Sequence, residues 1–184
     1  MSDSPRDNSA QLASSAYLLA TLDQDFLLGP TMRGARLLIE YEKAEQALQA
    51  YGVESTLVVF GSARVREDGP QRLARWYAEA RAFGYIASKE GGAVDGDGKR
   101  RRNVIATGGG PGVMEAANRG AFEAGAPSIG FNITLLTEQH PNRFTTPELT
   151  FQFRYFAMRK LHFAMRARAL IVFPGGFGTL DELF

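Results

Sequence analysis

Residues 174–182 read Pro-Gly-Gly-Phe-Gly-Thr-Leu-Asp-Glu and follow directly after the apolar run Ala-Leu-Ile-Val-Phe of residues 169–173. An apolar run rich in branched residues is typical of a buried parallel strand, and the proline and glycines after it predict a turn. Thr179 then suits the N-cap of a helix, with Asp181 and Glu182 in the first turn, where acidic side chains complement the helix dipole. The stretch therefore predicts a strand, a glycine-rich turn and a helix.

Such a turn is suited to bind phosphate, because backbone N–H groups without side chains around them can reach an anion and the helix N-terminus attracts it. The same glycines can also form a simple tight turn. Glu182 is either a helix-dipole residue or a group that works beside the phosphate, and these residues alone leave both interpretations open.

The chain before this stretch alternates strand and helix patterns, which predicts an α/β fold: a Rossmann-like, doubly wound parallel sheet with helices on both faces. The predicted strands are residues 56–60, 103–107 and 127–134, an extended stretch at 149–153, and the run 169–173; the predicted helices are residues 70–90, 112–124 and 155–168. Ligands bind beyond the carboxyl ends of such strands. Glycine-rich turns follow three of the strands, so we expect them to form one pocket.

Two regions are expected along the chain: residues 1–52 as an N-terminal helical extension and residues 53–184 as the Rossmann-like nucleotide-binding domain. The extension holds a short helix between Leu12 and Leu22 and a longer one from Thr31 to Tyr51. It is expected to pack on the core domain or on a second subunit. The last predicted helix has barely begun at Phe184, so we expect the sheet to be truncated at the C-terminus.

Composition describes an ordinary globular domain: 184 residues, 45% hydrophobic and 22% charged. The formal net charge of +1 gives no support for a nucleic-acid or membrane partner. Cysteine is absent, which excludes disulfides and thiolate chemistry. No apolar run reaches the ~20 residues that span a bilayer, and no basic-then-apolar signal begins the chain. We therefore expect a cytoplasmic protein.

Several familiar sites do not fit the sequence. The triple glycine of residues 108–110 lacks the spacing and the acidic partner of an NAD fingerprint, and no Gly-Lys-Ser/Thr ends a P-loop. No lysine has a context that singles it out for a Schiff base with pyridoxal phosphate. His140 and His162 are too far apart for a local metal motif. We therefore expect no cofactor and no metal.

The motif Pro-Gly-Gly-x-Gly-Thr-x-x-Glu resembles the signature of the LONELY GUY (LOG) family, cytokinin riboside 5′-monophosphate phosphoribohydrolases long mislabelled as lysine decarboxylases. Residues 108–115, Gly-Gly-Gly-Pro-Gly-Val-Met-Glu, resemble the first glycine-rich loop of the family, and residues 158–160, Met-Arg-Lys, resemble its Met-x-x-Arg-Lys helix. Residues 60–63, Phe-Gly-Ser-Ala, resemble the end of its first strand. The matches run in order from about Thr56 to Phe184, and the N-terminal extension is similar to that of the longer family form.

The resemblance implies a hydrolase that releases the base of AMP or of a cytokinin nucleotide, with a homodimer as the assembly. It assigns catalysis to Arg159 and Glu182. It places the 5′-phosphate and the rest of the nucleotide against a shared set of residues: Ser62, Gly109, Gly110, Met114, Lys160, Gly175, Gly176, Gly178 and Thr179. A carboxylate can stabilise an oxocarbenium-like transition state or activate water, and an arginine can hold the phosphate or the departing base.

A second hypothesis remains beside the first. Related Rossmann-like domains bind nucleotides or cofactors without catalysis, and the longer family forms are less uniformly established as enzymes. The presence of both Arg159 and Glu182 favours the hydrolase. Binding of AMP without release of base would favour the binding protein.

Overall fold

The computed structural model describes residues 7–94, 99–134 and 140–184. The chain divides into two compact units, residues 1–39 and residues 40–184, and the division falls within helix α3 (Arg33–Ala50). Residues 40–52 thus belong to the same unit as the sheet. The sequence pattern predicts them as part of the N-terminal extension.

The first unit consists of short helical turns. These are α1 (Ser9–Leu12), a 3-10 turn at Ser15–Tyr17, α2 (Gln24–Leu28) and a second 3-10 turn at Pro30–Met32. The Asp23 carboxylate caps α2 by accepting a hydrogen bond from the N–H of Phe26 at 2.9 Å. The helix predicted between Leu12 and Leu22 is wrong. Its apolar residues are exposed, so no packing surface supports a longer helix there.

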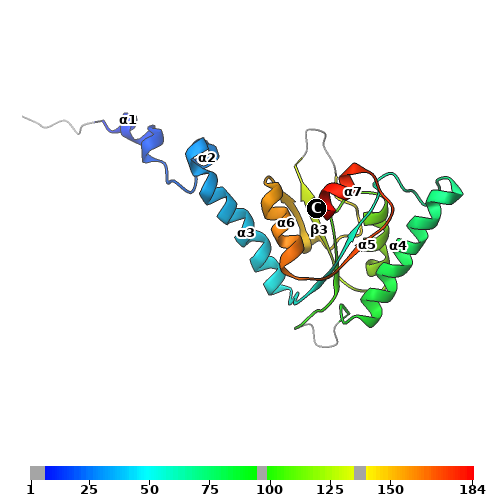
Figure 1. Cartoon of the computed structure of the whole chain (residues 1–184). Coiled ribbons are helices and arrows are strands. Elements are labelled where there is room, and N and C mark those ends of the chain that lie inside the picture. The colour runs from blue at the N-terminus through cyan, green and yellow to red at the C-terminus, as the bar shows by residue number, and fades with distance from the viewer. Residues whose placement is uncertain (1–6, 95–98, 135–139) are drawn as a thin grey trace, which may run out of the picture. The chain divides into compact units, whose positions relative to one another are not determined.

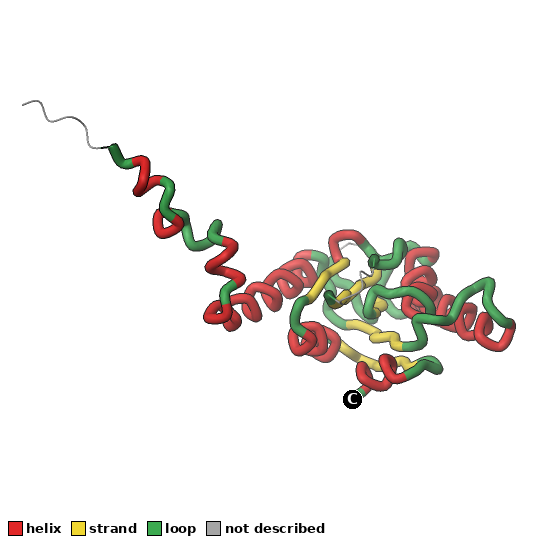
Figure 2. The backbone as a smooth tube through the Cα atoms, turned by 90° about the horizontal axis from the view of Figure 1, so that it is seen from above, coloured by secondary structure: helices red, strands yellow, loops and turns green. Residues whose placement is uncertain are grey.

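The second unit is built around a five-stranded parallel sheet with the strand order β4-β3-β2-β1-β5 (Figures 1 and 2). In chain order its elements are β1 (Thr56–Phe60), α4 (Gln71–Glu90), β2 (Val104–Thr107), α5 (Val113–Glu123), β3 (Ser128–Ile133), a 3-10 turn (Pro147–Leu149), β4 (Thr150–Phe153), α6 (Phe156–Met165), β5 (Ala167–Val172) and α7 (Phe177–Leu183).

Helices cover both faces of this sheet, as Figure 1 shows, and adjacent strand residues point to opposite faces. Val58 packs in one core cluster with α3 and α6, represented by Leu48 and Phe163. Val59 packs in the other cluster with α4 and α5, represented by Tyr77 and Ala117. The Rossmann-like α/β fold expected from the sequence is confirmed.

The last strand differs from the prediction in two respects. Helix α6 ends at Met165, and β5 starts at Ala167, so the strand takes residues that the sequence assigned to the helix. The strand is also largely exposed, with Leu170 at 44% and Val172 at 43%. The expectation of a buried strand is wrong because β5 lies at the edge of the sheet and pairs only with β1.

A buried network of polar side chains supports the turn after β2. The Thr107 hydroxyl and the Asn142 amide donate hydrogen bonds to Asn118 Oδ1 at 2.7 and 3.0 Å, and Asn118 Nδ2 donates to the Ser128 hydroxyl at 3.0 Å. Asn118 is fully buried. One side chain on α5 therefore connects β2, β3 and the loop that carries Asn142.

Replacement of Asn118 by leucine should destabilise the fold by about 3 kcal/mol, because buried hydroxyl and amide groups lose their partners. Urea unfolding of the variant measures the loss. Asn8→Leu, at an exposed position outside the sheet, serves as the control and should leave the midpoint unchanged. Equal midpoints for Asn118→Leu and the wild type would contradict the role given to the network.

His162 is buried on the other face of the sheet, within an aromatic cluster. Its ring stacks on Tyr41 with a centroid distance of 5.4 Å and lies 5.9 Å from Phe131 and 5.5 Å from Phe153. The side chain is 1% exposed. Burial lowers the pKa of the His162 imidazole below its ordinary value of 6.5, because the apolar surroundings disfavour the charged ring.

The lowered pKa predicts a pH dependence of stability. The folded state keeps His162 neutral while the unfolded chain binds a proton below pH 6.5, so stability should fall as the pH drops below that value. The melting temperature of the wild type should decrease more between about pH 7.5 and about pH 5.5 than that of His162→Phe. His140→Asn removes the other histidine and should keep the full dependence; an unchanged slope in His162→Phe would count against this explanation.

Candidate functional site

The glycine-rich turns after β1, β2 and β5 lie at the carboxyl ends of these parallel strands, and they meet at Ser62. The Ser62 N–H donates a hydrogen bond to the carbonyl of Pro174 at 3.2 Å, and the Ser62 carbonyl accepts one from the N–H of Val113 at 3.1 Å. The backbone of one residue therefore joins the turn before α7 to the start of α5. The Ser62 hydroxyl is used locally, since it accepts a hydrogen bond from the N–H of Arg64 at 3.1 Å.

Glycine is required where these turns pack together. Gly112 has φ of 76°, in the left-handed region, and a side chain there would collide with the Ser62 carbonyl. A Cβ at Gly61 would lie 2.6 Å from Val113 Cγ1. The close approach of the β1 turn to α5 thus depends on the absence of side chains.

The last helix begins nearly one turn earlier than predicted. Gly176 is its N-cap and Thr179 lies inside the helix, so the N-cap role expected for Thr179 is wrong and no acidic residue occupies the first turn. The Thr179 side chain is buried in the space left by the missing side chain of Gly175. This packing places the start of the helix at Phe177, and Glu182 then lies in its second turn.

Glu182 and Arg159 form a buried ion pair. Arg159 Nη1 donates a hydrogen bond to Glu182 Oε1, and the two side chains are 7% and 14% exposed. Arg159 Nε donates to the carbonyl of Phe131 at 2.6 Å, and its guanidinium lies over the ring of Phe163 at 5.3 Å. Glu182 Oε2 is buried and accepts no hydrogen bond within residues 7–94, 99–134 and 140–184. One carboxylate oxygen therefore has spare capacity to accept a hydrogen bond.

The ion pair lines a small cavity of about 110 Å³ at this edge of the sheet. Its lining residues are Phe60, Gly61, Met114, Arg159, Gly178, Thr179 and Glu182. The structure thus brings together five of the residues named from the sequence. Met114 also packs against Gly108 and Gly110. The cavity joins the start of α5, the middle of α6 and the first turns of α7.

The remaining residues of the last turn surround this cavity. A Cβ built on Gly176 or Gly178 would have no atom within 4 Å, so the backbone there is open to an approaching ligand. Lys160 does not line the cavity; its ammonium donates to the carbonyl of Asp181 at 2.6 Å. Arg159 and Lys160, adjacent on α6, therefore both contact α7.

Gly109 and Gly110 do not line the cavity. The Gly109 N–H donates to the Thr107 hydroxyl at 3.0 Å, and its carbonyl accepts from the N–H of Asn142 at 2.8 Å. The Gly110 carbonyl accepts from Asn142 Nδ2 at 3.1 Å. These backbone groups hold the loop itself together, and the Asn118 network continues into it through Asn142.

Sequence reasoning missed Asn118 and Asn142. A signal for Asn118 exists, because an asparagine interrupts the small apolar residues Ala116, Ala117 and Ala121 on one side of α5. A polar residue on a buried helix face needs partners, so it indicates a network. Asn142 follows Pro141 in a stretch without periodicity, and no local pattern singles it out.

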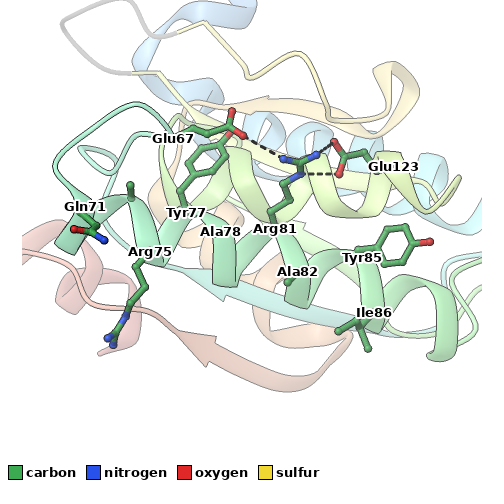
Figure 3. Close-up of a pocket in the computed structure, with 11 residues that line it drawn as sticks. Glu67, Gln71, Arg75, Tyr77, Ala78, Arg81, Ala82, Tyr85, Ile86 and Glu123 are labelled. Atoms are coloured by element: carbon green, nitrogen blue, oxygen red, sulfur yellow. Dashed lines mark hydrogen bonds and ion pairs between the residues drawn. The ribbon is translucent and has the colours of Figure 1, made fainter.

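A larger hollow of about 660 Å³ runs along α4 (Figure 3), and Arg159 and Glu182 are not among its lining residues. Its carboxylates are already engaged: Arg81 pairs with Glu123 at 2.7 Å and with Glu67 at 3.2 Å. The small cavity with the free Glu182 oxygen is therefore the better candidate for chemistry. In the part of the chain that the structure describes, no group of histidine and acidic side chains is arranged to hold a metal ion, and no helix is long and apolar enough to cross a membrane.

Comparison with known proteins found a similar family model and a similar solved structure. A family model described as "Possible lysine decarboxylase" matches residues 114–184, which include Met114, Arg159 and Glu182. Among solved structures, the chain is similar to the X-ray structure of TM1055, a structural genomics target, with a TM-score of 0.54 and 22% identity. The match covers 70% of this chain and 66% of TM1055, just under two thirds of its length.

No curated protein matches the chain. At 22% identity, the likeness to TM1055 shows the fold alone. By sequence, the part of the chain that holds the ion pair is similar to the family described as possible lysine decarboxylase.

Proposed function

We propose that the protein hydrolyses the N-glycosidic bond of a nucleoside 5′-monophosphate, AMP or a cytokinin riboside monophosphate, to free base and ribose 5-phosphate. The observation that carries this proposal is the buried Arg159–Glu182 pair beside an open glycine-rich turn, with one Glu182 oxygen free. The resemblance of the motifs to the LOG family supports the same reaction.

The residues of the cavity suit the two halves of that reaction. As the bond from C1′ to the base breaks, its electrons go to the base nitrogen and positive charge develops on the ribose. Glu182 stabilises this charge and takes a proton from the water that attacks C1′. Arg159 holds the carboxylate in place from its other oxygen. The departing base takes a proton from solvent and Glu182 returns its proton to solvent, so that free base and ribose 5-phosphate are the products.

The open backbone at Gly176 and Gly178 is the proposed place for the 5′-phosphate. The first N–H groups of a helix have no acceptor within it, and anions bind there when the surrounding residues leave room. The cavity itself, about 110 Å³, is smaller than the ~300 Å³ or more of typical ligand pockets. The ribose would therefore occupy the cavity mouth while the phosphate lies along the exposed turn.

A lysine decarboxylase has less support from the same cavity. Pyridoxal phosphate needs a lysine amine for its Schiff base. No lysine is among the described residues that line the cavity, and Lys160 is directed to the Asp181 carbonyl instead.

The homodimer remains part of the proposal. Helix α6 exposes Leu161 and Met165, which are 39% and 42% exposed and lie four residues apart on the same side of the helix. Burial of such a stripe between two copies would remove apolar area from water. Light scattering of the purified protein should give twice the mass of the chain, and a monomer at micromolar concentration would exclude this part of the proposal.

Glu182→Gln should lower the rate of base release from AMP by about a hundredfold or more, because the amide cannot take the proton. Chromatography of the reaction with AMP and with isopentenyladenosine monophosphate measures free base and identifies the preferred substrate. Asp181→Asn, a neighbouring exposed carboxylate, is the matched control and should keep full activity.

The AMP-induced rise in melting temperature should persist in Glu182→Gln, since the phosphate contacts are unchanged. Full turnover in that variant would disprove the role of Glu182. A wild-type protein that binds AMP but releases no base would instead be a nucleotide-binding protein without this activity.

A further inference from the structure

Helix α6 carries Arg159, and residues of α3 hold it at both ends. At its N-terminal end, the Glu40 carboxylate accepts hydrogen bonds from the N–H of Arg154 at 2.9 Å and of Tyr155 at 3.2 Å. Tyr155 is the N-cap of α6 and provides no side-chain cap of its own. A carboxylate from another helix therefore accepts a hydrogen bond from the N–H of the N-cap residue, as the acidic side chain of a capping box does.

At the C-terminal end of α6, Glu45 pairs with Arg166, the C-cap residue. Arg166 Nη1 and Nη2 donate to the two Glu45 oxygens, each at 2.7 Å, and Arg166 Nε donates to the carbonyl of Val53 at 3.1 Å. Both side chains are nearly buried, at 13% and 11% exposed. The Arg166 guanidinium lowers the pKa of the Glu45 carboxyl, so the pair stays ionised near neutral pH.

Between these ends, the ring of Tyr41 stacks on His162. His162 lies one turn after Arg159 on the same buried side of α6, together with Phe163. The three contacts from α3 thus fix where α6 sits along its axis and how it is rotated. The axial position and the rotation of α6 together determine where the Arg159 guanidinium lies.

The ionic contacts between α3 and α6 fix the alignment of the two helices in a way that apolar contacts would not. A buried ion pair gives little net stability compared with apolar residues of the same volume, because desolvation offsets the attraction. A two-pronged pair does fix geometry, since both hydrogen bonds are made in only one alignment. Arg159 needs such alignment because it must reach the Phe131 carbonyl and Glu182 at once.

We propose that Glu40 and Glu45 on α3 are positioning residues that act through α6 to hold Arg159 in its working position. This inference rests on the proposed function in so far as Arg159 takes part in the reaction. It extends the machinery of the site to residues that precede the sheet and lie outside the segment matched by the family model.

The decisive variant is Glu45→Leu combined with Arg166→Met. The apolar pair fills the same space and should keep the melting temperature at or near that of the wild type, but it removes the two-pronged alignment. We expect kcat to fall about tenfold because Arg159 is misplaced, while KM for AMP stays within about twofold. Glu45→Gln should behave alike if it folds.

Glu42→Gln is the matched control on the same helix. The Glu42 carboxylate accepts an exposed hydrogen bond from Gln46 at 3.1 Å, and among the described residues it makes no hydrogen bond or ion pair with α6. It should keep the kinetics of the wild type. A double variant with normal stability and normal kcat would overturn the proposal, because it would show that the pair serves stability alone.

A second readout does not depend on turnover. Arg159 is 6% exposed and should react slowly with phenylglyoxal in the wild type and in Glu42→Gln. In the double variant its labelling, measured by mass spectrometry of the peptide, should become several times faster. Unchanged labelling would overturn the positioning role. If the wild type releases no base, the proposed function fails, and the labelling rates still decide whether α3 positions Arg159.

Discussion

The structure of the site depends on one buried positive charge. An isolated charge in a protein interior costs several kcal/mol, so Arg159, at 6% exposed, requires partners in fixed places. Among the described residues these partners are the Phe131 carbonyl on β3, the Glu182 carboxylate on α7 and the face of the Phe163 ring on α6 itself. Each partner belongs to a different element. The positions of those elements are therefore linked through a single guanidinium.

The strand order explains why a long side chain from a helix makes this link. β3 and β5 are not neighbours, because β2 and β1 lie between them in the sheet. No strand residue at the end of β3 could reach α7, which follows β5. Helix α6 lies over the face shared by these strands and connects with β3 through Phe163 and Phe131, whose rings lie 5.1 Å apart. The Arg159 side chain can thus reach both the Phe131 carbonyl on β3 and the Glu182 carboxylate on α7.

Local sequence patterns predict much of the fold and of the candidate site. The features that they miss depend on tertiary packing. Strands β1 to β3, helices α4 and α5 and the glycine turns follow from periodicity and turn residues, and Arg159 with Glu182 follow from a motif. The N-cap of α7 was misplaced because burial of Thr179 against Gly175 outweighed its capping preference. The Glu45–Arg166 pair joins residues 121 positions apart, and the Asn118 network joins three elements. Local sequence patterns carry no information on such pairings.

The two partners of the ion pair are held to very different degrees. Arg159 lies on a helix with a carboxylate at each end and an aromatic stack between. Glu182 lies on α7, whose Phe177 and Leu180 are 92% and 47% exposed, and Gly176 before the helix and Gly178 in its first turn have free space around them. A ligand larger than the 110 Å³ cavity must gain room where the fewest contacts are lost. The Glu182 carboxylate can therefore move at lower cost than the Arg159 guanidinium, so a ligand of the proposed kind would meet a fixed cation and an adaptable carboxylate.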